Sequence, residues 1–105
     1  MGRSVRLTAE AVNNLAAIRD YIRADSSANA ERWLERINAK ILSISAAPLK
    51  CEMAYPASLV GRDVRRTLLG VYVILHVLED DDLVVVAVRH AARRPLSAGE
   101  VMRLR

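Results

Sequence analysis

Residues 64–88 read VRRTLLGVYVILHVLEDDDLVVVAV. Their short apolar runs are rich in valine, leucine and isoleucine, which is typical of β-strands. The pattern predicts strands at 64–69, 71–78 and 83–88, with a turn or bulge at Gly70 and a turn at the acidic residues 80–82. Because turns this short reverse the chain, the three strands form an antiparallel meander. The nearly continuous apolar runs indicate a sheet that is covered on at least part of both faces.

Two amphipathic helices precede this meander. The first is expected over 9–24, capped by Thr8, and the second over 28–46, ended by Pro48. Their apolar stripes follow helical spacing: Ala11, Leu15, Ile18 and Ile22 in the first, and Ala30, Leu34, Ile37, Ile41 and Ile44 in the second. The break between the helices is short, so they form an antiparallel hairpin.

The remaining segments complete a single α+β domain over residues 1–105. Residues 4–7 alternate as a short first strand, and residues 48–63 are expected to be a long loop. Ser97 and Glu100 have the spacing of a capping box, which predicts a short helix at about 98–104. The expected architecture is a strand, a helical hairpin and a three-stranded meander packed on that hairpin.

Composition excludes several classes of protein. Hydrophobic residues make up 52% of the 105 residues, enough for one modest core, and no apolar run is as long as a membrane helix or a signal peptide. The single cysteine, Cys51, cannot form an intramolecular disulfide or a cysteine-based zinc cage. We therefore expect a cytoplasmic protein with no metal and no cofactor.

The charge pattern indicates an acidic partner. Sixteen basic residues face twelve acidic ones, and fourteen of the sixteen are arginine, which binds carboxylate or phosphate with two prongs. An acidic protein and a nucleic acid both fit, although aromatic residues for base stacking are few. We expect the start of the second strand and the end of the fourth to meet at one end of the sheet. Their basic residues would then form one rim: Arg62, Arg65, Arg66, Arg89, His90, Arg93 and Arg94.

Two other sets of residues have alternative interpretations. Apolar side chains beside the main helical stripes either contact a partner or lie beneath the sheet and the long loop: Val12, Tyr21, Trp33 and Leu42. Glu52 and His90 are the plausible proton carriers of the chain, because arginine stays protonated. Tyr72 and His76 share one side of their strand and are expected to be half-buried, and Cys51 is expected to be a bystander.

The chain resembles the ParE/RelE superfamily of toxins from type II toxin–antitoxin modules, and the ParE branch most closely. The resemblance spans roughly residues 5–95. The hairpin segments LTAEAVNNLAAIRDYI and AERWLERINAKILSISAAP carry its first part. Its second part is an arginine at Arg65, the Gly-x-Tyr motif at Gly70, an acidic turn and a strand ending in His-x-x-Arg at His90.

This resemblance implies a toxin that a cognate antitoxin, of the ParD-like or another family, neutralises by wrapping an amphipathic segment around it. ParE-branch toxins act on DNA gyrase, whereas RelE-branch toxins cut mRNA on the ribosome. No tyrosine, histidine or lysine follows His90, and this favours the gyrase poison. On that interpretation the target-binding residues are Arg65, Arg66, His90, Arg93 and Arg94, and the antitoxin-binding residues are Val12, Tyr21, Trp33 and Leu42.

The alternatives are an endoribonuclease and a degenerate toxin. A ribosome-dependent endoribonuclease would use Glu52, Arg65 and His90 as its catalytic residues. A degenerate toxin would only bind its antitoxin.

Overall fold

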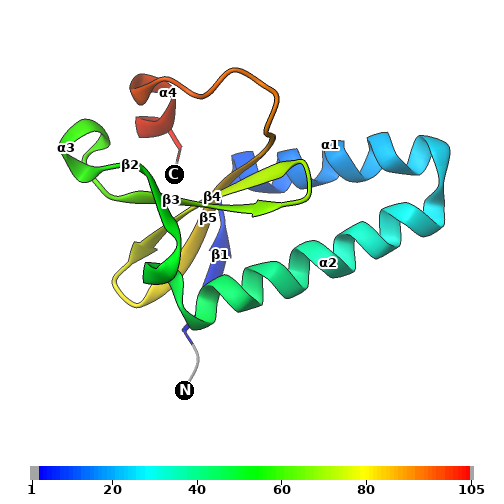
Figure 1. Cartoon of the computed structure of the whole chain (residues 1–105), viewed down its shortest axis with the longest axis horizontal. Helices are drawn as coiled ribbons and strands as arrows, with labels where there is room; N and C mark the ends of the chain where they lie inside the picture. Colours follow the sequence, from blue (N-terminus) through cyan, green and yellow to red (C-terminus); the bar gives the residue numbers. More distant parts are fainter. Residues whose placement is uncertain (1–2, 105) are drawn as a thin grey trace.

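The computed structural model describes residues 3–104, and its main elements follow the expected order (Figure 1). A short strand, β1 (Val5–Leu7), leads into two long helices, α1 (Ala9–Asp25) and α2 (Ser27–Ala46). Strands β3 (Val64–Leu69), β4 (Tyr72–Glu79) and β5 (Asp82–His90) form the antiparallel meander, and helix α4 (Ala98–Met102) follows. The α+β fold and the helical hairpin are therefore confirmed.

Local chemistry at the element ends matches the sequence signals. The Thr8 hydroxyl accepts a 3.0 Å hydrogen bond from the amide of Ala11 and so caps α1. Gly70 has a φ of +58° in the turn between β3 and β4, a conformation that favours glycine. The capping box of Ser97 and Glu100 begins α4, which is two residues shorter than expected.

Residues 48–63 are not the expected loop. They contain a 3₁₀ turn, η1 (Pro48–Lys50), a strand, β2 (Glu52–Tyr55), and a short helix, α3 (Ala57–Val60). Strand β2 pairs with β3 and completes a five-stranded sheet of order β1-β5-β4-β3-β2. It has only four residues and an irregular register, so pairing with β3, rather than its own apolar pattern, defines it.

The outer edge of β5 is covered by the N-terminal part of the chain. Strand β1 runs parallel to β5, against residues 83–85. Beyond β1, helix α1 and its cap contact this edge. The Thr8 hydroxyl donates to the carbonyl of Val86, and the Asn14 amide oxygen accepts from the amide of Val88. These contacts satisfy backbone groups next to an irregularity in the β4–β5 pairing.

The sheet separates two apolar clusters, as the continuous apolar runs predicted. On its first face the sheet packs against α1 and α2 through a cluster that includes Trp33, Ile37, Ile74 and Val85. On its second face, α3 and α4 cover a cluster that includes Val60, Val77, Val86 and Val101. Figure 1 shows the hairpin on one side of the sheet and α3 with α4 on the other.

The small helices leave part of the second face open. None of the helices within residues 3–104 is long and apolar enough to cross a membrane.

Candidate functional site

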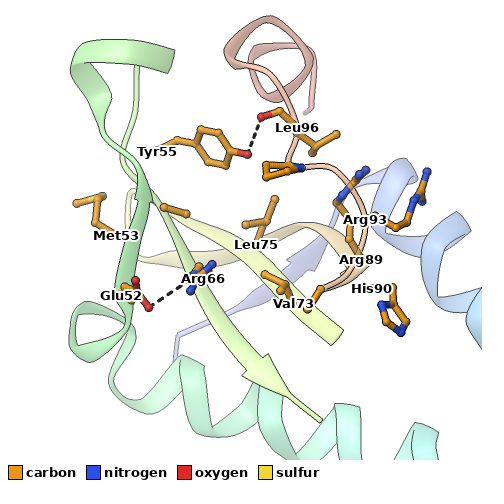
Figure 2. A pocket seen from close by; sticks show the side chains of 13 residues that line it. Glu52, Met53, Tyr55, Arg66, Val73, Leu75, Arg89, His90, Arg93 and Leu96 are labelled. Atoms are coloured by element: carbon orange, nitrogen blue, oxygen red, sulfur yellow. Dashed lines mark hydrogen bonds and ion pairs between the residues drawn. The ribbon is translucent and has the colours of Figure 1, made fainter. Parts of the chain in front are cut away.

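A cleft of about 420 Å³ occupies the open part of the second sheet face (Figure 2). It lies between β2 and residues 91–97, which we call the strap, the segment that connects β5 to α4. Val73 and Leu75 of β4 line the cleft together with three arginines, Arg66, Arg89 and Arg93. Three guanidinium groups around an apolar surface suit a ligand that carries both acidic and apolar groups. We call this site the basic cleft.

The expected single rim of basic residues is wrong in one respect: the ends of the second and fourth predicted strands do not meet. Arg65 near the start of β3 lies opposite His76 of β4, which lies opposite Val85 of β5. His90 at the end of β5 lies instead opposite Tyr72, at the start of β4. Two successive reversals restore the chain direction, so β3 and β5 run parallel and their starts lie at the same end.

The expected target-binding residues are therefore divided between two places. Arg66 lies in the middle of β3, on the second face, and it lines the basic cleft with His90 and Arg93. Arg65 lies at the other end of the sheet, where it donates a 2.8 Å hydrogen bond to the carbonyl of Cys51. Arg62 is also there and pairs with Glu79 at 3.3 Å.

Arg94 and Arg93 differ although they are neighbours on the strap. The Arg94 guanidinium pairs with Glu100 at 3.4 Å and donates to the carbonyl of Pro95. The Arg93 guanidinium makes no hydrogen bond or ion pair within residues 3–104, and its side chain is exposed at the basic cleft. Arg93 is thus the strap arginine available to a ligand.

Glu52 and His90 both line the basic cleft, but each has another partner. The Glu52 carboxylate pairs with Arg66 at 3.3 Å. The Nδ1 atom of His90 accepts the amide of Ala92 at 3.0 Å, and its ring meets the edge of Tyr72 at 5.6 Å between centroids. Figure 2 shows Glu52 and His90 on opposite sides of the floor. This arrangement does not form an acid–base pair poised on one bond.

His76 is buried rather than half-buried, and only 1% of its surface is exposed. Its Nε2 lies 3.0 Å from the Thr67 hydroxyl, which in turn lies 3.2 Å from the Cys51 sulfur. Burial, and secondarily the charge of Arg65, lower the pKa of His76 from 6.5 to about 4. The imidazole is therefore neutral at pH 7, and its contacts fasten the segment after α2 to β3 and β4.

The four hairpin residues expected to bind the antitoxin differ in their exposure. Val12, Tyr21 and Leu42 are exposed, with 51%, 77% and 67% of their surfaces accessible. Trp33 is instead a core residue, 7% exposed, and its ring meets Tyr72 edge-on at 5.4 Å between centroids. For Trp33 the alternative of burial against the sheet therefore holds and partner contact does not, because α2 turns this side chain toward the sheet together with Ile37 and Ile41.

Sequence reasoning did not single out Tyr55 or the apolar floor of the basic cleft. Tyr55 belongs to the segment read as a loop, and its hydroxyl donates a 2.7 Å hydrogen bond to the carbonyl of Leu96 on the strap. Val73 and Leu75 look like ordinary core residues in the sequence. Only the partial cover of the second face makes them a floor.

Residues 5–95 match the sequence profile of the family described as the ParE toxin of the type II toxin–antitoxin system, parDE. The chain belongs to the ParE toxin family. The matched region includes the hairpin, all five strands and both arginines of the strap. A comparison with curated protein sequences finds no match.

The fold is also that of a solved ParE-type structure. A chain from the "Chromosomal ParDE TA system from P. aeruginosa" superposes with a TM-score of 0.68 at 15% sequence identity. The superposition covers 84% of the present chain and 95% of that chain. At this identity the likeness concerns the fold, and it agrees with the family assignment from the sequence.

Proposed function

We propose that this ParE-family chain is a toxin that poisons DNA gyrase by binding it, and that a cognate antitoxin neutralises the toxin. The observation that carries the proposal is the basic cleft, in which three arginines surround an apolar floor on a member of this family. Such a surface attracts an acidic segment of a target and speeds its encounter. Binding, rather than bond cleavage, is the activity that these residues favour.

The antitoxin part of the proposal rests on the family and on the exposed hairpin. The solved relative is described as a ParDE toxin–antitoxin system. Val12, Tyr21 and Leu42 give the present chain exposed apolar side chains on α1 and α2, which suit the apolar side of an amphipathic segment. The net charge of +4 favours an acidic partner.

An endoribonuclease is the second candidate, since Glu52, His90 and three arginines line the same cleft. Arg65 does not belong to that set, because its side chain points to the opposite face of the sheet from that of Arg66 and lines another cavity with His76. For catalysis Glu52 must leave Arg66, and His90 must give up the amide of Ala92. These requirements make ribonuclease chemistry the weaker proposal.

One experiment separates the two candidates. The full chain is induced under tight control, and gyrase supercoiling and cleaved-complex formation are measured beside the integrity of ribosome-bound mRNA. We expect inhibited supercoiling and intact mRNA. Site-specific mRNA cleavage that Glu52→Gln abolishes would overturn the gyrase proposal and support the ribonuclease.

A further inference from the structure

Side chains hold the strap at alternate residues, in addition to two backbone hydrogen bonds, from the Ala91 amide to the Val71 carbonyl at 2.7 Å and from the Arg93 amide to the His90 carbonyl at 3.1 Å. The amide of Ala92 donates to Nδ1 of His90 at 3.0 Å, and the carbonyl of Arg94 accepts from the Arg89 guanidinium at 2.9 Å. The carbonyl of Leu96 accepts from the Tyr55 hydroxyl at 2.7 Å. Three side chains from β2 and β5 thus hold the strap backbone, and Arg93 lies between two of the attached residues.

The hydrogen bond between the Ala92 amide and His90 indicates what His90 does. A ring nitrogen accepts a hydrogen bond only when it carries no proton, so Nδ1 of His90 is the acceptor of this bond. A bond from a side chain to the amide two residues later is the one that asparagine makes in an Asx turn. His90 therefore shapes the turn by which the chain leaves β5 and enters the strap.

We infer that His90, Arg89 and Tyr55 are positioning residues that hold the strap so that Arg93 faces the basic cleft before a target arrives. This inference rests on the proposed toxin function, and it gives His90 a role through the strap rather than in target contact or proton transfer. If the strap is already ordered before binding, no entropy is lost in ordering it when the target binds. The affinity for the target therefore rises without any new contact. Loss of one attachment then weakens target binding although all the arginines of the strap remain.

Two substitutions of His90 separate the acceptor atom from the ring. His90→Phe keeps a ring beside Tyr72 but removes the acceptor, whereas His90→Asn removes the ring and keeps an acceptor for the amide of Ala92. We call the three side-chain attachments of the strap the clamp. Tyr55→Phe removes the attachment at Leu96 and nothing else, so it tests the clamp at a site away from His90. Arg36→Met, on the exposed side of α2, is a matched control for Arg89→Met, because both remove one arginine.

Trypsin measures the order of the strap without reference to any target. The bond between Arg93 and Arg94 lies in the strap, and its cleavage rate follows the population of the opened segment. We expect cleavage there to rise about five-fold, which corresponds to about 1 kcal/mol, in His90→Phe, Tyr55→Phe and Arg89→Met. His90→Asn and Arg36→Met are expected to match the wild type, and circular dichroism checks that each variant is folded.

Activity is measured on the same variants as gyrase inhibition and as growth arrest on induction. We expect the concentration for half-inhibition to rise about five-fold in the variants with a faster-cleaved strap, and His90→Asn to retain wild-type potency. Unchanged cleavage in the clamp variants would overturn the inference, and so would faster cleavage with undiminished growth arrest. If the wild type arrests growth without inhibiting gyrase, the gyrase proposal fails, while cleavage and growth arrest still decide the role of the clamp.

Discussion

At the scale of single residues, His76 links stability to pH. Its pKa is about 4 in the folded chain and near 6.5 when the histidine is exposed, so the unfolded chain binds more protons between these values. Stability therefore falls as pH drops from about 6.5 toward 4. The penalty is complete below pH 4 and absent above pH 7.

This pH dependence is checked by thermal unfolding at pH 7.5, 5.5 and 4.5. We expect the midpoint of the wild type to fall more steeply with decreasing pH than that of His76→Leu, in which position 76 no longer titrates. Removal of His76 leaves the Thr67 hydroxyl its contact with the Cys51 sulfur. Equal pH slopes in the two proteins would show that His76 does not control this range.

Trp33 is expected to matter for folding rather than for partner contact. Trp33→Ala removes a buried ring that packs on Tyr72, and such truncations cost about 3–5 kcal/mol. Urea unfolding monitored by circular dichroism measures this loss, and Trp33→Phe should lose much less. A loss below about 1 kcal/mol for Trp33→Ala would contradict its place in the core.

At the scale of elements, the two ends of the sheet are expected to carry different roles. Arg93→Ala combined with Arg94→Ala should abolish growth arrest and leave thermal stability nearly unchanged. The Arg94–Glu100 pair is exposed, and exposed pairs contribute little. Arg93→Lys should also lose activity, because a lysine keeps the charge without the two-pronged geometry.

Arg65→Met provides the comparison at the other end. It loses the bond to the Cys51 carbonyl, so we expect a lower melting temperature and nearly wild-type inhibition of gyrase by the folded protein. Growth arrest that survives in the double strap variant but disappears in folded Arg65→Met would reverse the assignment of the two ends.

At the scale of the whole molecule, the exposed hairpin and the basic cleft are separate surfaces on opposite faces of the sheet. Leu42→Asp puts a charge into the exposed apolar surface of α2 and should weaken binding of the cognate antitoxin at least ten-fold by calorimetry. Ser43→Asp, one position further along the same exposed helix, is the matched control. Equal affinities for the two variants would remove Leu42 from the antitoxin interface, and unchanged melting temperatures exclude a folding effect.

The site could be predicted only in part from the sequence. Arg66, His90 and Arg93 line one cleft, although the prediction from strand ends that grouped them is wrong: β4 separates β3 from β5, and the strap that follows β5 lines the same cleft as β3. Arg65 does not lie with them for two reasons. Neighbouring side chains of a strand point to opposite faces, and the start of β3 lies at the same end of the sheet as the start of β5 rather than its end. Tyr55 was not identified, because a four-residue strand with an irregular register has no clear periodic signal.

The sequence by itself determined the helices, the caps and the meander, because helical spacing, capping hydroxyls and short turns act between residues close in the chain. Only the tertiary structure decided that Trp33 faces the sheet and that α3 and α4 cover part of the second face. These features depend on pairing and packing between segments far apart in sequence, such as β2 with β3 and Tyr55 with Leu96. The basic cleft exists because that long-range packing, which buries Leu75 and half-buries Val73, leaves a hollow above them between β2 and the strap.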